Sequence, residues 1–267
     1  MRLSSLPILF FLASPLVVLA QGNYEVQVYG SEMTEVGHTM VELHSNFTFQ
    51  GSKDTVDGVR PTEHALHETV EITQGFTKWF ETGFYQFTSY RPGEGFQWVG
   101  THIRPRVGVP EEWKWPIGVS LSAEVGYQRR SYSADTWTLE IRPIFDKQID
   151  RWYFCFNPVL DRSFHGAGVP QGLVFSPNVK IAYDVTKKVT FGMEYYGSVG
   201  SIRGFDPISD QQHAIMPSID LNLSKNWEFN FAAGVGLTGA TDHMLVKMIL
   251  GRRFDFNWKK KKTGAVQ

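Results

Sequence analysis

Ionisable residues recur at alternate positions of several apolar stretches, a spacing that places them on one face of an extended chain. Carboxylates and cations on one face can pair with each other or hold a charged solute between them, whereas lone buried charges are costly. We expect this face to line an interior. Its predicted members are Glu42, His44, Arg104, Arg106, Glu124, Glu140, Arg142, Lys180, Glu194, Asp220, Glu228 and Lys247, with Glu68, Glu81 and Arg253 placed by the same alternation.

Two interpretations of this face stay open. In the first, the charged side chains are structural cross-braces that pair across the interior. In the second, Arg104, Arg106 and Arg142 oppose the carboxylates and align a small polar or charged solute.

Nucleophilic and metal-binding chemistry has less support in the sequence. No G-x-S-x-G motif marks a serine nucleophile. His213 follows Ser209 and Asp210 only within a loop-like stretch, and His64 and His67, three positions apart, would face opposite sides of a strand. We therefore expect no catalytic residue, metal or cofactor, and we keep a lipid-modifying barrel enzyme as the least favoured alternative.

The elements that position these residues are β-strands. Residues 226–237 (NWEFNFAAGVGL) place apolar side chains at every second position, and 116–130 and 189–198 repeat the pattern. The sequence predicts twelve such strands, at about 38–49, 64–74, 78–90, 96–108, 116–130, 136–146, 151–161, 174–185, 188–198, 211–223, 226–237 and 243–256.

The connections between these strands alternate in length. Those after even-numbered strands are mostly short turns, and those after odd-numbered strands, including 51–63, 161–172 and 200–210, are mostly long. This asymmetry is typical of up-and-down barrels in the outer membrane. Unpaired backbone groups are costly in lipid, so the sheet must close. The predicted fold is all-β: a single closed antiparallel transmembrane β-barrel of about twelve strands.

The chain ends suggest export. Residues 1–20 read as a signal peptide cleaved near Ala20, followed by a periplasmic N-terminal lead at 21–37 with a β piece at 24–29. The barrel would span 38–256, and 257–267 form a basic tail with lysines at 259–262. Cys155 is the only cysteine, so no internal disulfide forms, and the net charge of −1 gives no reason to expect nucleic acid.

The last predicted strand ends in ILGRRFDF (249–256), which resembles the C-terminal signal read by barrel-assembly machinery. The tail that follows departs from that signal, because most such barrels stop at the final aromatic residue. The expected partners are therefore this machinery, membrane lipids and lipopolysaccharide, together with a small-molecule solute.

Several segments resemble a group of Gram-negative outer-membrane barrels catalogued as transporters and linked by name to the meta-pathway of phenol degradation: YEVQVY at 24–29, VELH at 41–44, IRPR at 103–106, NPVLDR at 157–162, KIAYD at 180–184 and LGRRF at 250–254. The resemblance covers most of the chain after residue 20. It implies an outer-membrane barrel and supplies no catalytic residues. The positions in matching segments to test first are His44, Arg104, Arg106, Asn157, Asp161, Arg162 and Lys180.

The function expected from these observations is an outer-membrane channel or transporter-like barrel for small polar or aromatic solutes, with the charged lumen as its filter. The alternative is a structural or plugged outer-membrane barrel without transport.

Overall fold

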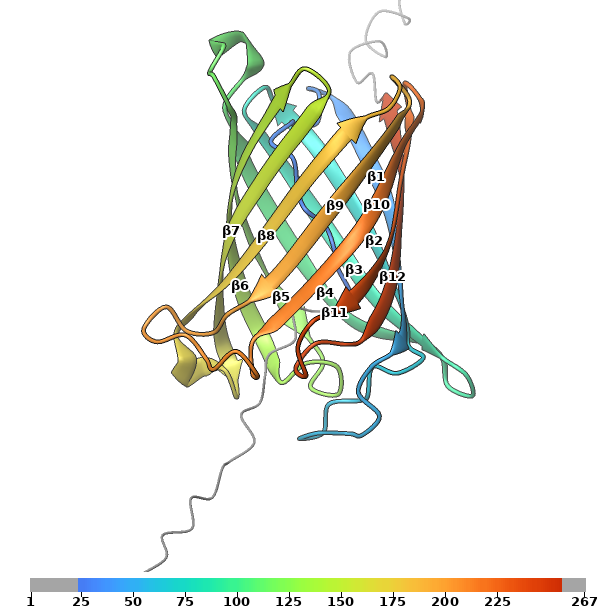
Figure 1. The fold of residues 1–267 in the computed structure, drawn as a ribbon, viewed down its shortest axis with the longest axis vertical. Coiled ribbons are helices and arrows are strands. Elements are labelled where there is room, and N and C mark those ends of the chain that lie inside the picture. Colours follow the sequence, from blue (N-terminus) through green and yellow to red (C-terminus); the bar gives the residue numbers. More distant parts are fainter. Residues whose placement is uncertain (1–23, 256–267) are drawn as a thin grey trace, which may run out of the picture.

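The computed structural model describes residues 24–255, in which twelve antiparallel strands form one closed barrel (Figure 1). The strands are β1 (His38–Gln50), β2 (Leu66–Thr77), β3 (Phe80–Arg91), β4 (Gly95–Gly108), β5 (Gly118–Gln128), β6 (Asp135–Ile149), β7 (Trp152–Gly166), β8 (Leu173–Asp184), β9 (Val189–Ser198), β10 (Gln212–Ser224), β11 (Trp227–Gly236) and β12 (Met244–Asp255). Two short 3-10 helices, η1 (Glu111–Trp113) and η2 (Val169–Gln171), lie in connections.

Each strand pairs with its neighbours in the chain, and the first strand also pairs with the last. Along β1, Val41 lies opposite Ile72 of β2 on one side and Arg252 of β12 on the other. No strand edge is left open, which is what a sheet in lipid requires. The predicted twelve-stranded barrel is confirmed. The predicted signal peptide, the basic tail and Phe256 lie outside the described residues.

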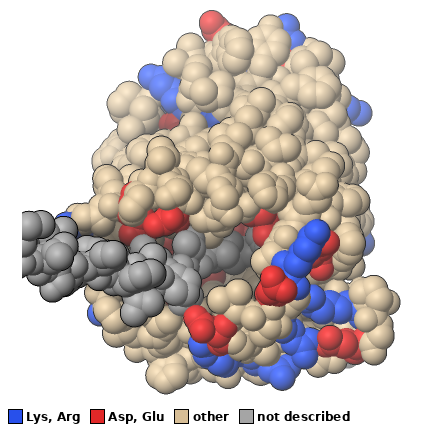
Figure 2. All heavy atoms as spheres, turned by 60° about the horizontal axis from the view of Figure 1, so that its bottom comes forward, with Lys and Arg blue, Asp and Glu red and all other residues tan. Residues whose placement is uncertain are grey.

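The outer wall of the barrel is apolar. Figure 2 shows a broad band without charged side chains between charged groups at the two ends. Exposed members of the wall come from most strands and include Ile72, Phe84, Ile103, Leu121, Phe154, Ile181, Met193 and Phe231. Within the described residues, no helix has both the length and the apolar character needed to cross a membrane.

The two ends of the barrel differ as the connection lengths predicted. In Figure 1 the long connections, such as 51–65 and 199–211, lie at the bottom, and the short turns lie at the top, together with the longer connection that carries η1. The exposed tryptophans Trp79, Trp113, Trp115, Trp152 and Trp227 lie beside the turns. Such aromatic side chains are enriched where a membrane meets water.

One register in the sequence analysis was wrong. In β2 the buried face carries His67, Thr69, Glu71 and Thr73, so Glu68 lies on the outer face, where it accepts a hydrogen bond from Ser45 at 2.7 Å. Glu71, which is fully buried, takes the inward position instead. Glu68 lies at the loop end of the strand, where a charged side chain can remain on the outer face.

The lead was also wrongly placed outside the barrel. Residues 24–37 form no strand and run through the barrel interior from the loop end to the start of β1 (Figure 1). Tyr24 contacts His67 near the loop end, with ring centroids 4.3 Å apart. At the turn end, the amide of Thr34 donates to Glu81 at 2.6 Å. The lead is therefore part of the interior of the barrel.

Candidate functional site: the charged interior of the barrel

The structure places the predicted site residues on the inner face of the strands. Eight of them are buried: Glu42, His44, Arg104, Arg106, Glu124, Arg142, Glu194 and Lys247. Glu140, Lys180, Asp220 and Glu228 are half-buried, with Glu228 near the start of β11. The strand register explains this arrangement, because alternate residues on paired strands share one face.

One group of charges joins β8, β9, β10 and β12. Lys180 lies opposite Glu194 in the β8–β9 register, 3.2 Å from its carboxylate, and is 2.7 Å from Asp220. Lys247 is 2.6 Å from the other oxygen of Glu194 and donates to the Tyr196 hydroxyl at 3.0 Å. These side chains form a chain of alternating charges along the wall.

A second group lines β2 to β6 and consists of four pairs, with these shortest N–O distances: Arg104–Glu71 2.6 Å, Arg106–Glu81 3.3 Å, Arg142–Glu140 2.6 Å and His102–Glu124 2.6 Å. The β3–β4 register places Glu81 directly opposite Arg106. Pairing of this kind offsets the cost of burying charge. Arg104, Arg106 and Arg142 therefore lie on the same side of the lumen as the carboxylates with which they pair.

The lead binds to these arginines through its backbone. Arg142 donates to the carbonyl of Gln27 at 3.0 Å, and Arg106 donates to the carbonyls of Gly30 and Glu32 at 2.6 and 2.9 Å. The side chains of the lead are acidic at residues 25, 32 and 35 and include no base. An acidic segment thus occupies the side of the lumen that carries the arginines.

Tyr29 is the most heavily contacted residue of the lead. Its amide donates to the Asn157 side chain at 2.8 Å, and its carbonyl accepts from the same side chain at 2.9 Å. The guanidinium groups of Arg104 and Arg142 lie over its ring, at 4.4 and 4.8 Å from the centroid. Cation–π contacts of this kind gain strength where water is excluded. Tyr29 is therefore the central anchor of the lead.

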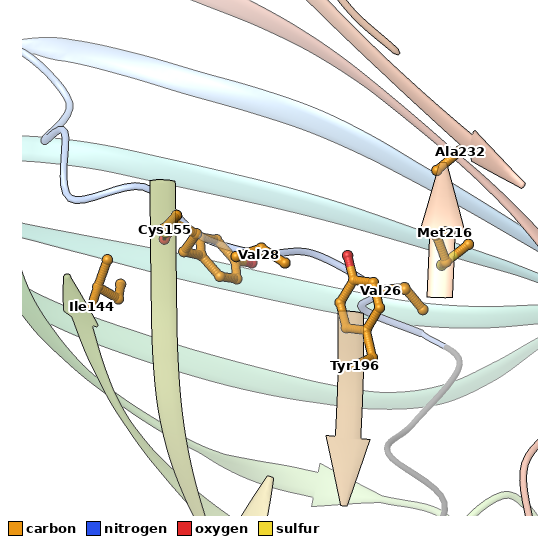
Figure 3. Packing of buried hydrophobic residues seen from close by; sticks show 8 residues of the cluster. Val26, Val28, Ile144, Cys155, Tyr196, Met216 and Ala232 are labelled. Atoms are coloured by element: carbon orange, nitrogen blue, oxygen red, sulfur yellow. The ribbon is translucent and has the colours of Figure 1, made fainter. Parts of the chain in front are cut away.

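The lead also has an apolar side. Val26 and Val28 pack in a buried cluster with Ile144, Cys155, Tyr196, Met216 and Ala232, as Figure 3 shows, and Tyr29 belongs to the same cluster. Near Val26, a cavity of about 80 Å³ lies between the lead and β9–β12. Apolar contacts and hydrogen bonds thus hold opposite sides of the same segment.

Sequence reasoning missed four interior groups. Glu71 was lost with the β2 register, and the aromatic side chains Tyr85 and Phe87 face inward on β3, a strand whose apolar residues fall on both faces. His102 was not placed inward, although it alternates with Arg104 and Arg106 on β4. That alternation was the signal that could have identified it.

Ion pairs also join neighbouring loops or turns at each end of the barrel. At the loop end, Glu94 accepts a hydrogen bond from Arg60, which raises the pKa of the Arg60 guanidinium. At the turn end, Lys78 donates to Glu112 at 2.9 Å, and this hydrogen bond lowers the pKa of the Glu112 carboxyl. Each pair ties neighbouring connections together at the surface.

The histidines considered for catalysis or metal binding do not group with the residues that such a site would need. His213 hydrogen-bonds Tyr195 at 2.7 Å and Gln211 at 2.9 Å, whereas Ser209 donates to Asp210. His67 is buried in β2, but His64 precedes the strand and has a positive φ of 56°. Neither set of residues therefore forms the catalytic or metal site that its spacing in the sequence could have indicated.

Comparison with known proteins gives a likeness of fold. No protein-family model matches the chain, and a search of curated proteins found no match. Among solved structures, the NanC porin aligns with a TM-score of 0.53 at 6% identity, covering 79% of this chain and 97% of that one. The KdgM porin in complex with disordered oligogalacturonate gives 0.47 at 10%, covering 81% and 99%, and the outer membrane protein Omp33 of Acinetobacter baumannii gives 0.43 at 13%, covering 81% and 98%. The likeness to NanC supports the barrel fold, and the resemblance to the phenol-degradation group stays a prediction.

Proposed function

We propose that the chain is an outer-membrane channel for small polar or aromatic solutes, with the charged interior as its filter and residues 24–37 controlling the free cross-section. The observation that carries the proposal is the binding of arginines on the barrel wall to the backbone of a segment outside the sheet. Arg106 and Arg142 donate hydrogen bonds to backbone carbonyls of the lead. Without the lead, these donors would face the lumen and be free to meet the polar atoms of a solute.

The outer membrane is the location that fits this architecture. An apolar outer wall would meet acyl chains, with lipopolysaccharide around the loop end, and the predicted export signal and C-terminal signal would deliver the chain to barrel-assembly machinery. Separation of envelope from soluble fractions of expressing cells tests this location. Recovery of the chain with the soluble fraction would contradict it.

A second candidate is a plugged barrel without transport, and the lead itself favours it. Its hydrogen bonds to Arg106, Arg142 and Asn157 hold it along the lumen, and the cavity beside Val26 is only about 80 Å³. Typical ligand pockets have roughly 300–1,000 Å³. This candidate predicts that removing the lead opens the barrel, while the intact protein passes nothing under any condition.

Conductance in planar lipid bilayers separates the two candidates. The proteins to compare are the intact chain, a chain lacking residues 24–36, and a control with Arg60→Gln in the β1–β2 connection. The channel proposal expects openings of the intact protein, larger conductance after deletion, and no change in the control. An intact protein that never opens supports the plugged barrel, and a deleted chain that still forms the barrel but passes no ions contradicts the channel.

Liposome swelling then addresses the solute. Vesicles containing the intact or the lead-deleted protein are challenged with sugars, amino acids and aromatic acids of similar size. The proposal expects polar and aromatic solutes to enter at different rates, because the charged wall contacts them differently. Equal rates for all solutes of one size would contradict a filtering role.

A further inference from the structure

Three buried side chains on β1 and β2, in the charged interior, converge on one point of the barrel wall. Glu42 and His44 are two positions apart on β1, so they share the inner face, and Glu71 lies directly opposite Glu42 on β2. One oxygen or nitrogen atom of each lies within 4.8 Å of the others. The strand register alone brings these three groups together.

The separation of His44 and Glu71 suits two ligands of a shared ion. Nε2 of His44 lies 3.4 Å from a carboxylate oxygen of Glu71. Charge-assisted hydrogen bonds usually measure about 2.8 Å. Two ligand atoms about 2.1 Å from one zinc ion, at the tetrahedral angle, are about 3.4 Å apart. The observed separation is therefore longer than a strong hydrogen bond and matches that of two zinc ligands.

The Glu71 carboxylate is fixed by partners outside the cluster. One oxygen accepts hydrogen bonds from Arg104 at 2.6 Å and from the Thr73 hydroxyl at 2.7 Å. The other oxygen is the one that lies toward His44. Metal-binding carboxylates are commonly oriented by hydrogen bonds of this kind. On the side of the cluster, the second oxygen of Glu71 has only the long contact to His44 and a hydrogen bond from the Tyr29 hydroxyl at 3.5 Å.

Glu42 and His44 have polar atoms that the rest of the chain leaves unsatisfied. Glu42 is 7% exposed, and within residues 24–255 its carboxylate forms no hydrogen bond or ion pair. His44 is 0% exposed; within the described residues its Nδ1 has no hydrogen-bond partner, and its Nε2 has only the Glu71 carboxylate at 3.4 Å. Opposite Glu42 on β12 stands Gly251, and the side chains of Met40 and Glu228 pack against it. Buried polar groups without partners are costly, so their presence here points to a ligand.

Carboxyl groups outnumber guanidinium groups around the cluster, with Glu25, Glu42, Glu71, Glu124 and Glu140 against Arg104 and Arg142. A bound divalent ion would favour the ionised form of these carboxyls.

We propose that Glu42, His44 and Glu71 form a binding site for one divalent transition-metal ion, with Zn²⁺ as the best match. One imidazole and two carboxylates suit zinc and its neighbours in the first transition row. The site joins β1 to β2 beside the lead, where the Tyr29 hydroxyl lies 3.5 Å from Glu71. A bound ion would therefore stabilise the barrel wall at the central anchor of the lead.

The first test is a Co²⁺ titration of untagged full-length protein that has been treated with EDTA and kept in detergent micelles. The expected result is one equivalent bound, with the absorption bands of four-coordinate Co²⁺, displaced by Zn²⁺. Glu42→Gln and His44→Gln should abolish these bands. His67→Gln is the matched control, because His67 is a buried β2 histidine outside the cluster, and it should leave them intact. No bound equivalent, or bands that persist in both cluster variants, would overturn the proposal.

Thermal unfolding separates the effect of the substitution from the effect of the metal. In EDTA, Glu42→Gln should have a higher midpoint temperature than the unmodified protein, because an unpaired buried carboxylate is removed. Zn²⁺ should raise the midpoint temperature of the unmodified protein but not that of Glu42→Gln. Thr73→Val, which removes a hydrogen bond to Glu71, should weaken Co²⁺ binding about tenfold. If His44→Gln does not fold, these two variants decide the matter. A zinc-dependent rise that survives Glu42→Gln would refute the site.

Discussion

The thiol of Cys155 lies 3.0 Å from the carbonyl oxygen of Tyr29, so the single cysteine of the chain is covered by the lead. Cys155 is 3% exposed. A thiol reagent in the lumen can reach it only when the lead moves away. The position of the lead can therefore be followed in the natural sequence, without an introduced label.

The first prediction concerns the hydrogen bonds that hold Tyr29. Asn157→Ala removes both contacts between this side chain and the Tyr29 backbone, and each such loss costs about 1 kcal/mol. The lead should leave its site more often, and Cys155 should react with a maleimide about thirtyfold faster than in the unmodified protein. Stopped-flow or quenched labelling followed by mass spectrometry measures the rate.

A neighbouring asparagine supplies the control for that experiment. Asn178 lies directly opposite Asn157 on β8 and is also fully buried, but its side chain has no hydrogen-bond partner in the described chain. Asn178→Ala should leave the labelling rate unchanged. Equal acceleration in both variants would mean that general loosening of the wall, rather than release of the lead, exposes the thiol.

The second prediction concerns the buried pair between Lys247 and Glu194, each with a side chain 1% exposed and 2.6 Å apart. Lys247→Met should lower the free energy of unfolding by about 3 kcal/mol, at the low end for a broken buried pair, because Lys180 still faces Glu194. Guanidinium unfolding in lipid vesicles measures it. Adding Glu194→Gln should recover part of the loss, since no uncompensated carboxylate then remains. A double variant less stable than the single one would contradict this account.

How far the sequence predicts this structure depends on how clearly each segment alternates. Strands such as β5 and β11 alternate over their whole length, and their register follows from side-chain period alone. On β3, Tyr85 and Phe87 face the lumen, whereas Glu68 on β2 faces outward near the loops. Hydrophobicity alone cannot assign a face there, because the lead provides an apolar partner inside the barrel.

The position of the lead could not be predicted from the sequence, for a related reason. Residues 24–29 alternate like a strand, with Tyr24, Val26 and Val28 buried, but no strand pairs with them. Their partners are side chains far away in the sequence, including Asn157 and Arg142. The pairings of Arg104 with Glu71 and Lys247 with Glu194 likewise depend on the closed barrel, so only the inward placement of most of these residues was predictable.

The third prediction concerns ion selectivity and depends on the proposed channel. Replacing Arg104, Arg106 and Arg142 with glutamine in the chain that lacks residues 24–36 removes three positive charges from one side of the lumen, while Glu71, Glu81 and the other carboxylates remain. The channel should shift toward cations. Reversal potentials in a KCl gradient measure the shift, and Arg129→Gln, at the loop end, serves as the control. An unchanged reversal potential would show that ions do not pass these arginines.

The fourth prediction concerns pH at the turn end of the barrel. The hydrogen bond from Lys78 lowers the pKa of Glu112, so this pair adds stability above the ordinary carboxyl pKa and loses it as the pH falls through the lowered value. Lys78→Met should return the pKa of Glu112 toward its ordinary range. A carboxyl-detected NMR titration measures it. Lys114→Met removes a charge from the same connection without that hydrogen bond and should shift the pKa less.

The fifth prediction tests whether the outer wall lies in lipid. Met193 is at the middle of β9 with 47% of its surface exposed, and Ile149 ends β6 beside a turn with 50% exposed. In water, arginine at either outward position would have a similar, small effect. In a bilayer, Met193→Arg should cost about 2–4 kcal/mol and Ile149→Arg about 0–1 kcal/mol, because the cost of a charge depends on depth. Guanidinium unfolding in lipid vesicles compares them. Equal costs would place the middle of the wall outside the hydrocarbon and would contradict the membrane assignment itself.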